Sequence, residues 1–135
     1  MSGQANVLVA LIAIVDDDQS VREATTSLLK ANGYRAEVFD SAESFLAARS
    51  LAETKCLILD VHMPGMSGLE LQQRLAVENR RIPIIFISAH DNQNFRRQAA
   101  RSGAIDFLPK PFSEAALLRA IRSALGTGDE DQNPR

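Results

Sequence analysis

The sequence predicts an α/β fold with a doubly wound, five-stranded parallel sheet, and three observations support this. Five short apolar runs end at Val15, Phe39, Leu59, Ile87 and Leu108. Runs such as residues 84–87 are apolar at every position, which is typical of parallel strands that are buried on both faces. Segments with helix signals separate the runs. A strand that alternates with a helix five times indicates right-handed crossovers and helices on both faces of the sheet.

Local signals predict where the helices begin and end. Capping boxes occur at residues 20–23 and 67–70, and residues 40–43 form the variant that starts with Asp. Three glycines stand where helix C-termini need a left-handed residue: Gly33, Gly103 and Gly126. Apolar side chains recur at helical spacing at Val21, Ala24, Leu28 and Ala31 in the first helix, and at Leu118, Ile121 and Leu125 in the last. Pro109 predicts that the fifth strand is an edge, because proline has no N–H to donate.

Length and composition limit the class of protein. The chain of 135 residues fits one domain, which we expect at residues 1–125, with a flexible tail or the start of a linker at residues 126–135. Charged residues make up 24% of the chain and the net charge is −2. We therefore expect no nucleic-acid binding by this domain.

Two further features predict a cytoplasmic protein. Cys56 is the only cysteine and has no zinc-type spacing, so we expect a small core residue in a reducing compartment. The apolar stretch at residues 7–15 has no Lys or Arg before it and no small-residue cleavage site after it, which argues against a signal peptide. The stretch is also far too short to cross a bilayer, so no membrane association is expected.

Polar side chains follow four of the apolar runs. Asp16 and Asp17 follow the first run, Asp60 the third, Ser88 the fourth and Lys110 the fifth. In an open parallel sheet, ligands bind outside the carboxyl ends of the strands, so these side chains converge if the first and third strands are neighbours. Three carboxylates in one pocket repel one another, and a hard divalent cation relieves that repulsion. Oxygen-only ligands indicate Mg²⁺ rather than zinc or copper.

The same residue types suit the transfer of a phosphoryl group to Asp60. A carboxylate can act as the nucleophile and form an acyl phosphate. The transfer otherwise needs little more than neutralisation of the charge on the equatorial oxygens of the phosphoryl group. The metal would neutralise one oxygen, the Ser88 hydroxyl would donate to a second, and the Lys110 ammonium would pair with the third. Asp60 alone could be a helix cap, but Ser67 already has that role for the next helix.

Together, these motifs resemble the receiver domain of two-component response regulators. They comprise residues 14–18 (IVDDD), 59–68 (LDVHMPGMSG), 87–89 (ISA) and 103–112 (GAIDFLPKPF), and the similarity runs from about Leu11 to Leu125. Residues 39–46 (FDSAESFL) and the turn after Asp60 are most similar to the FixJ-type subgroup. The resemblance implies a flavodoxin-like (βα)5 fold with strand order 2-1-3-4-5.

The resemblance also implies a role for each site residue. Asp60 would be the phospho-acceptor. Mg²⁺, for which Mn²⁺ can substitute, would be bound by Asp17, Asp60, the backbone carbonyl of His62 and, through water, Asp16. The phosphoryl group and the switch would involve Ser88, Lys110, the backbone of Ala89, and Phe107. The bond between Lys110 and Pro111 would be cis, and Asp18, outside the matched pair, is expected to start a helix.

The predicted function is a phosphorylation-controlled switch in signal transduction and not a turnover enzyme. The donor would be a sensor histidine kinase or a histidine phosphotransfer protein, and the switch would control an output such as transcription. Phosphorylation would promote a homodimer through the face of the fourth helix and fifth strand. Two alternatives remain open. One is an aspartyl-nucleophile phosphatase, which generally has an acid where this chain has His62, and the other is a docking module with a vestigial site.

Overall fold

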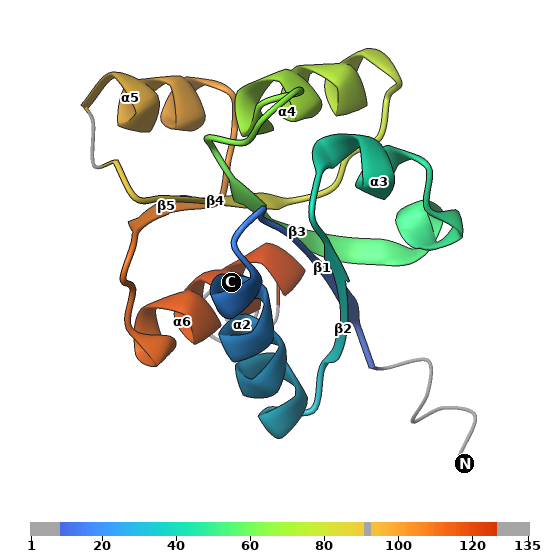
Figure 1. Cartoon of the computed structure of the whole chain (residues 1–135), viewed down its shortest axis with the longest axis vertical. Coiled ribbons are helices and arrows are strands. Elements are labelled where there is room, and N and C mark those ends of the chain that lie inside the picture. Colours follow the sequence, from blue (N-terminus) through green and yellow to red (C-terminus); the bar gives the residue numbers. More distant parts are fainter. Residues whose placement is uncertain (1–8, 91–92, 127–135) are drawn as a thin grey trace, which may run out of the picture.

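The computed structural model describes residues 9–90 and 93–126 of the chain (Figure 1). A five-stranded sheet with the order β2-β1-β3-β4-β5 forms its centre, and every neighbouring pair of strands is parallel. The strands are β1 (Leu11–Val15), β2 (Arg35–Phe39), β3 (Thr54–Asp60), β4 (Ile84–Ser88) and β5 (Asp106–Pro109). The predicted fold class and strand order are therefore confirmed, and β5 is an edge strand as Pro109 predicted.

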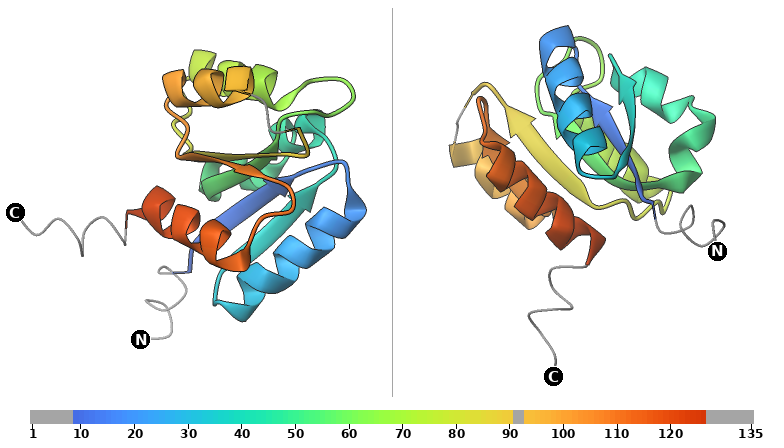
Figure 2. Two further views of the ribbon diagram at one scale, coloured as in Figure 1. Left: turned by 90° about the vertical axis from the view of Figure 1, so that its left-hand side faces the viewer. Right: turned by 90° about the horizontal axis from the view of Figure 1, so that it is seen from below.

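Helices cover both faces of this sheet. They are α2 (Gln19–Ala31), α3 (Ala42–Leu46), α4 (Gly68–Val77), α5 (Gln93–Arg101) and α6 (Glu114–Leu125), with a 3₁₀ helix η1 (Arg49–Glu53) before β3. Figure 1 shows α3, α4 and α5 on one face and α2 and α6 on the other, and the two turned views in Figure 2 agree. In the described ranges, no helix has the length and apolar character to cross a membrane.

Alternating residues of the central strands divide the core into two layers. Odd-numbered residues of β1 and β3, such as Val15 and Leu59, pack with Phe45 and Leu71 on the side of α3, α4 and α5. Even-numbered residues of the same strands, such as Ile12, Ile14 and Ile58, face the other side of the sheet. There they pack against Leu29 of α2 and Ile121 of α6. Cys56 belongs to the second layer, and burial raises the pKa of its thiol to about 12, as fits an unreactive core residue.

The helix ends agree with the prediction in part. Both hydrogen bonds of the capping box form between Ser67 and Glu70, and Gly33, Gly103 and Gly126 have positive φ at helix ends. The box predicted at residues 20–23 is wrong, because the carboxylate of Asp18 accepts from both the N–H and the hydroxyl of Ser20 and starts α2 earlier. Asp18 is thus a helix-start residue as expected. α3 is capped by Ser41 instead of Asp40.

The buried stripe of α2 agrees with the prediction in part. Val21 and Leu28 pack against the core as predicted, whereas Ala24 and Ala31 are exposed and Thr25 and Leu29 are buried. Threonine can bury its methyl group, and a small alanine loses little when it faces solvent, so spacing alone misassigned one side of the stripe. In α6 the predicted Ile121 is buried, together with Leu117. The tail predicted at residues 126–135 lies, apart from Gly126, outside the described residues.

Candidate functional site

Three carboxylates meet at the carboxyl ends of β1 and β3. Asp16 and Asp17 directly follow β1, Asp60 ends β3, and one carboxylate oxygen of each lies within 4.8 Å of the others. Asp16 is fully buried and Asp60 is 4% exposed, whereas Asp17 faces solvent. The predicted convergence occurs because β1 and β3 are neighbours and their ends lie in register, with Val15 opposite Leu59.

Lys110 reaches this acidic cluster from the other side of the sheet's carboxyl edge. Its Nζ lies 2.9 Å from Oδ2 of Asp16 and 3.5 Å from Oδ2 of Asp60. Its backbone N–H donates to the carbonyl of Ser88 at 2.7 Å, which ties the segment after β5 to the end of β4. The bond to Pro111 is cis, as the resemblance implied. One ammonium group thus contacts two buried carboxylates and supplies them with a counter-charge.

The crowding of charge changes the protonation of the site. Burial, and then the neighbouring charge of Asp16, raise the pKa of Asp60 to about 7, although Lys110 opposes the shift. Burial disfavours the ammonium of Lys110, but its contacts with Asp16 and Asp60 outweigh that effect and raise its pKa. Lys110 therefore stays charged at neutral pH, while Asp60 sits near the midpoint of its titration.

Two contacts fix the acidic end of β1. Oδ1 of Asp16 accepts the N–H of Asp18 at 2.9 Å, which closes a short turn into α2. The guanidinium of Arg22, one turn into that helix, donates to the backbone carbonyl of Asp16 at 2.7 Å. Arg22 was not predicted as a site residue, because nothing in the sequence distinguishes it from the other arginines on helices.

Gly68 is a second residue that the sequence analysis missed. A Cβ at this position would lie 2.3 Å from the backbone oxygen of Asp60, closer than any side chain tolerates. Gly68 also donates its N–H to the carbonyl of Val61 at 3.0 Å. The start of α4 therefore packs directly on the backbone that carries Asp60, and only glycine permits that approach.

Ser88 ends β4 with its side chain fully buried. Its hydroxyl accepts the N–H of His90 at 3.0 Å and lies 3.1 Å from the His90 carbonyl, so it is engaged within its own loop. Ala89 lies between them and is exposed. The His90 ring packs edge-on against His62 at 4.9 Å between centroids, and His62 packs against Phe95 of α5 at 4.7 Å. This cluster joins the two loops that follow β3 and β4.

Phe107 lies further along the sheet, in the edge strand β5. It is 7% exposed and belongs to the core layer under α3, α4 and α5. The guanidinium carbon of Arg96 in α5 lies 5.0 Å from its ring centroid, a cation–π distance. Phe107 and Ser88 therefore occupy neighbouring strands, and Phe107 pairs with Phe86 two positions before Ser88.

The acidic cluster fits a hard divalent cation. Its donors are all carboxylate oxygens, two of them buried, and it is open to solvent on the side of Asp17. Mg²⁺ prefers such oxygen ligands and retains several waters, which a half-open site allows. The three predicted carboxylates, Asp16, Asp17 and Asp60, are thus close enough together for one ion.

Comparisons with known proteins agree with this geometry. The response regulator receiver domain family matches residues 12–122. The response regulator protein TmoT of Ectopseudomonas mendocina is 50% identical over 116 residues, which cover 86% of this chain and 53% of TmoT. The chain spans about half the length of the curated relatives it matches.

Solved structures give the same result. The response regulator StyR is 46% identical, with a TM-score of 0.81 over 94% of this chain and 64% of StyR. The structure of FixJ-N is 35% identical, with a TM-score of 0.77 over 86% of this chain and 93% of FixJ-N, which confirms the predicted similarity to FixJ. The chain belongs to the response regulator receiver domains of two-component systems.

Proposed function

We propose that Asp60 accepts a phosphoryl group from a histidine kinase or a histidine phosphotransfer protein in a Mg²⁺-dependent reaction. The observation that carries the proposal is the surroundings of Asp60: a nearly buried carboxylate with Asp16 and Asp17 within 4.8 Å and the Lys110 ammonium at 3.5 Å. A nucleophile between a cation-binding cluster and a fixed ammonium group suits phosphoryl transfer, which depends on positioning and charge neutralisation.

The ion would be held by oxygen atoms at the ends of β1 and β3. We assign Asp17 and Asp60 as direct ligands, the backbone carbonyl of His62 as a third, and Asp16 as a ligand through water. When bound, Mg²⁺ would lower the pKa of Asp60 and neutralise one phosphoryl oxygen. Mn²⁺ has the same preference for oxygen ligands and could substitute.

The chain's own residues account for the other phosphoryl oxygens. An oxygen of Asp60 would attack phosphorus while the bond to the donor imidazole breaks, and that imidazole, already protonated on its other ring nitrogen, leaves as the neutral group. Lys110 would exchange its contact with Asp60 for one with a phosphoryl oxygen. The backbone N–H of Ala89 and the hydroxyl of Ser88 would donate to the others, and Ser88 would have to break its turn with His90 to do so.

The movement of Ser88 links the site to a distant surface. We infer that it changes the packing of Phe107 on the neighbouring strand and so reshapes the face of α5 and β5. That face exposes Arg97, Arg101 and Asp106, a mixture of charges suited to a homodimer contact. A change in sedimentation on adding beryllofluoride would support this association, and an unchanged monomer would refute it.

A cavity beside the site is suited to bind the protein that donates the phosphoryl group. It has a volume of about 610 Å³, lies between α2 and the start of α6, and includes Lys110 in its wall. Its apolar residues, Val21, Leu28 and Phe112 among them, could take the apolar face of a donor helix while the donor histidine reaches Asp60. We propose this groove as the docking site of the kinase.

The cytoplasmic location of the protein stays a prediction.

We propose that the protein is a switch without a separate small-molecule substrate. Its phosphoaspartate is later hydrolysed with help from the same ion.

The test of phosphorylation at Asp60 is incubation with acetyl phosphate and Mg²⁺, followed by mass spectrometry of the intact chain. The unsubstituted chain should gain one phosphoryl group that hydroxylamine removes, and Asp60→Asn should gain none. Asp18→Asn, which keeps a helix-capping side chain on the same loop, should be labelled normally. Stoichiometric labelling of Asp60→Asn would refute the assignment.

A further inference from the structure

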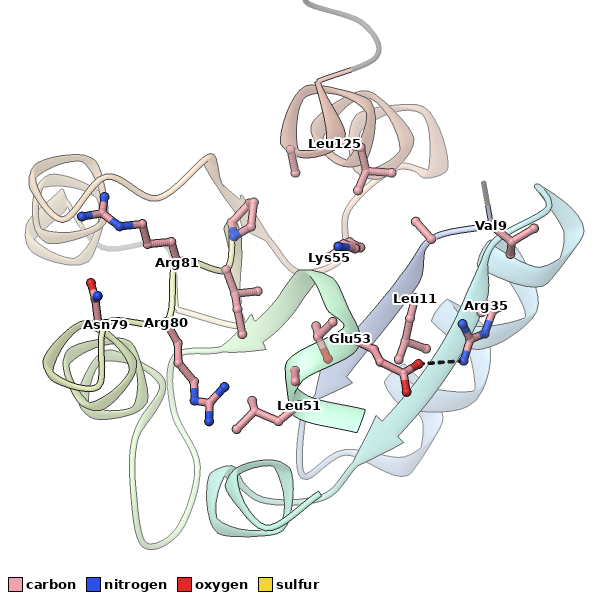
Figure 3. A pocket seen from close by; sticks show the side chains of 16 residues that line it. Val9, Leu11, Arg35, Leu51, Glu53, Lys55, Asn79, Arg80, Arg81 and Leu125 are labelled. Atoms are coloured by element: carbon pink, nitrogen blue, oxygen red, sulfur yellow. Dashed lines mark ion pairs between the residues drawn. The ribbon is translucent and has the colours of Figure 1, made fainter. Parts of the chain in front are cut away.

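A large cavity lies at the amino end of the sheet, away from the carboxylates. Its volume is about 990 Å³ (Figure 3). The starts of β1 and β3, the loop before β4 and the end of α6 line it, and both Val9 and Leu125 stand at its edge. The chain therefore enters and leaves the described domain at this cavity.

The wall of the cavity is basic in a chain whose net charge is negative. Four cationic residues line it, Arg35, Lys55, Arg80 and Arg81, against one acidic residue, Glu53. Glu53 pairs with Arg35 at 3.5 Å, and Arg80 lies 3.7 Å from Glu78 outside the lining.

Two of these cations remain available for another partner. Lys55 and Arg81 are exposed, and neither forms an ion pair with any residue in the two described ranges. The C-terminal dipole of α4 gives one structural reason for basic residues in the loop that follows it. Lys55 lies in a strand, so that reason does not apply to it. Figure 3 shows the Lys55 side chain beneath Leu125, between α6 and β3.

An acidic run of the same chain begins just beyond Leu125. Residues 129–131 are Asp-Glu-Asp, and only residues 126–128, Gly-Thr-Gly, separate them from α6. Three residues span up to about 10 Å when extended, and five span about 17 Å, so the acidic run stays within this distance of Leu125, which lines the cavity. Gly126 has φ 81, so α6 ends there with a change of direction.

We propose that residues 129–131 bind the basic cavity of their own chain, with carboxylates paired to Lys55 and Arg81. The short connection gives the acidic run an effective concentration in the millimolar range, so the run occupies the cavity when its ion pairs together reach millimolar affinity. This inference does not depend on phosphorylation of Asp60.

A spin label can test this contact, because Cys56 is fully buried and will not react. A nitroxide on Gln132→Cys should broaden the amide signals of Lys55 and Arg81 strongly. The broadening should fall severalfold when Asp129→Asn, Glu130→Gln and Asp131→Asn are added to the labelled chain. The charge-conserving set Asp129→Glu, Glu130→Asp and Asp131→Glu should restore it. Equal broadening in the acidic and neutral labelled chains would overturn the proposal.

Competition with inorganic phosphate gives an independent measurement on the unlabelled chain. If the acidic run occupies the cavity, phosphate should shift the Lys55 and Arg81 signals at severalfold lower concentration in the neutral variant than in the natural sequence. Equal affinity in both chains would mean that the cavity accepts an anion but not this segment, and would reject the proposal. Lys55→Glu with Arg81→Glu should abolish the phosphate response in either background.

Discussion

The two ends of this sheet hold charge in opposite ways. At the carboxyl end, Asp16 and Asp60 are nearly or fully buried, and one ammonium, that of Lys110, contacts both. At the amino end, cations surround an open cavity, and the pair of Arg35 and Glu53 has side chains 52% and 63% exposed. Buried charge produces a large pKa shift at one end, whereas at the other end water and salt screen each charge.

The direction of the helices explains part of this difference. In the described chain, helices α2, α4 and α6 follow strands β1, β3 and β5, so their N-termini lie towards the carboxyl end of the sheet. Partial positive charge there favours anions such as a phosphoryl group, and the C-termini at the other end favour cations. The fold thus suits anion chemistry near Asp60 before any specific ligand is considered, and the three carboxylates make that end responsive to a cation.

A pair of glycines, one at each end, should show how tightly each end is packed. Gly68→Ala places a methyl group 2.3 Å from the backbone oxygen of Asp60, and the clash should cost about 1–3 kcal/mol or more. Gly33→Ala, at the end of α2, meets no atom within 4 Å and should cost only the left-handed backbone penalty of about 1–2 kcal/mol. Thermal unfolding of both variants gives the comparison.

The same two variants should differ in their rate of phosphorylation. Gly68→Ala should slow labelling by acetyl phosphate at a temperature where it is still folded, because the backbone of Asp60 must move. Gly33→Ala should be labelled at the normal rate. If Gly68→Ala proves as stable and as reactive as the unsubstituted chain, then α4 does not constrain the acceptor.

Substitutions at the two ends of the sheet should also differ in their effect on Mg²⁺ affinity. Asp17→Asn removes one proposed direct ligand and should weaken Mg²⁺ binding at least about tenfold, or about 1.4 kcal/mol. Lys55→Gln, at the amino end, should leave Mg²⁺ affinity unchanged. The chain has no tryptophan, so calorimetric titration is the suitable measurement. Equal affinity for Asp17→Asn and the unsubstituted chain would remove Asp17 from the site.

The sequence predicted the sheet because apolar runs of strand length have few other solutions. It also predicted Asp16, Asp17, Asp60, Ser88 and Lys110 as one site, because each is the last residue of a strand or follows it within two residues, and parallel strands end at one edge. Contacts between backbone atoms were not predictable in this way. The approach of Gly68 to the Asp60 carbonyl has no signature in residue type.

The remaining errors have a similar origin. Arg22 acts through a single hydrogen bond to a carbonyl, which spacing along the chain does not reveal. The buried stripe of α2 was misassigned in part because Thr25 counts as polar in a hydrophobic pattern, although it is 3% exposed. The observed helix starts differ from the predicted ones by one or two residues, because several neighbouring Asp and Ser side chains compete to cap the same N–H groups.

The smallest expected effect concerns the stability of the metal-free protein. The pKa of Asp60 is about 7 in the folded chain against an ordinary value of 3.8, so the folded state binds more protons than the unfolded state between these values. Stability should therefore decrease as pH rises from about 4 to about 7. Asp60→Asn has no such proton to lose, so its melting temperature relative to the unsubstituted chain should rise across this range and level off above it.

The net gain at neutral pH should be about 1 kcal/mol, a shift of a few degrees, because the substitution also removes the contact of Asp60 with Lys110. Thermal unfolding followed by circular dichroism in the presence of a chelator, at several pH values, measures it. Gly33→Ala, at the amino end of the sheet, serves as the control, since it changes no ionisable group and should give a pH-independent difference. Excess Mg²⁺ should reduce the advantage of Asp60→Asn, because the ion stabilises only the chain that retains the carboxylate. A difference that stays constant from pH 4 to pH 8 would show that Asp60 is not crowded by its neighbours, and the contrast between the two ends would then rest on burial alone.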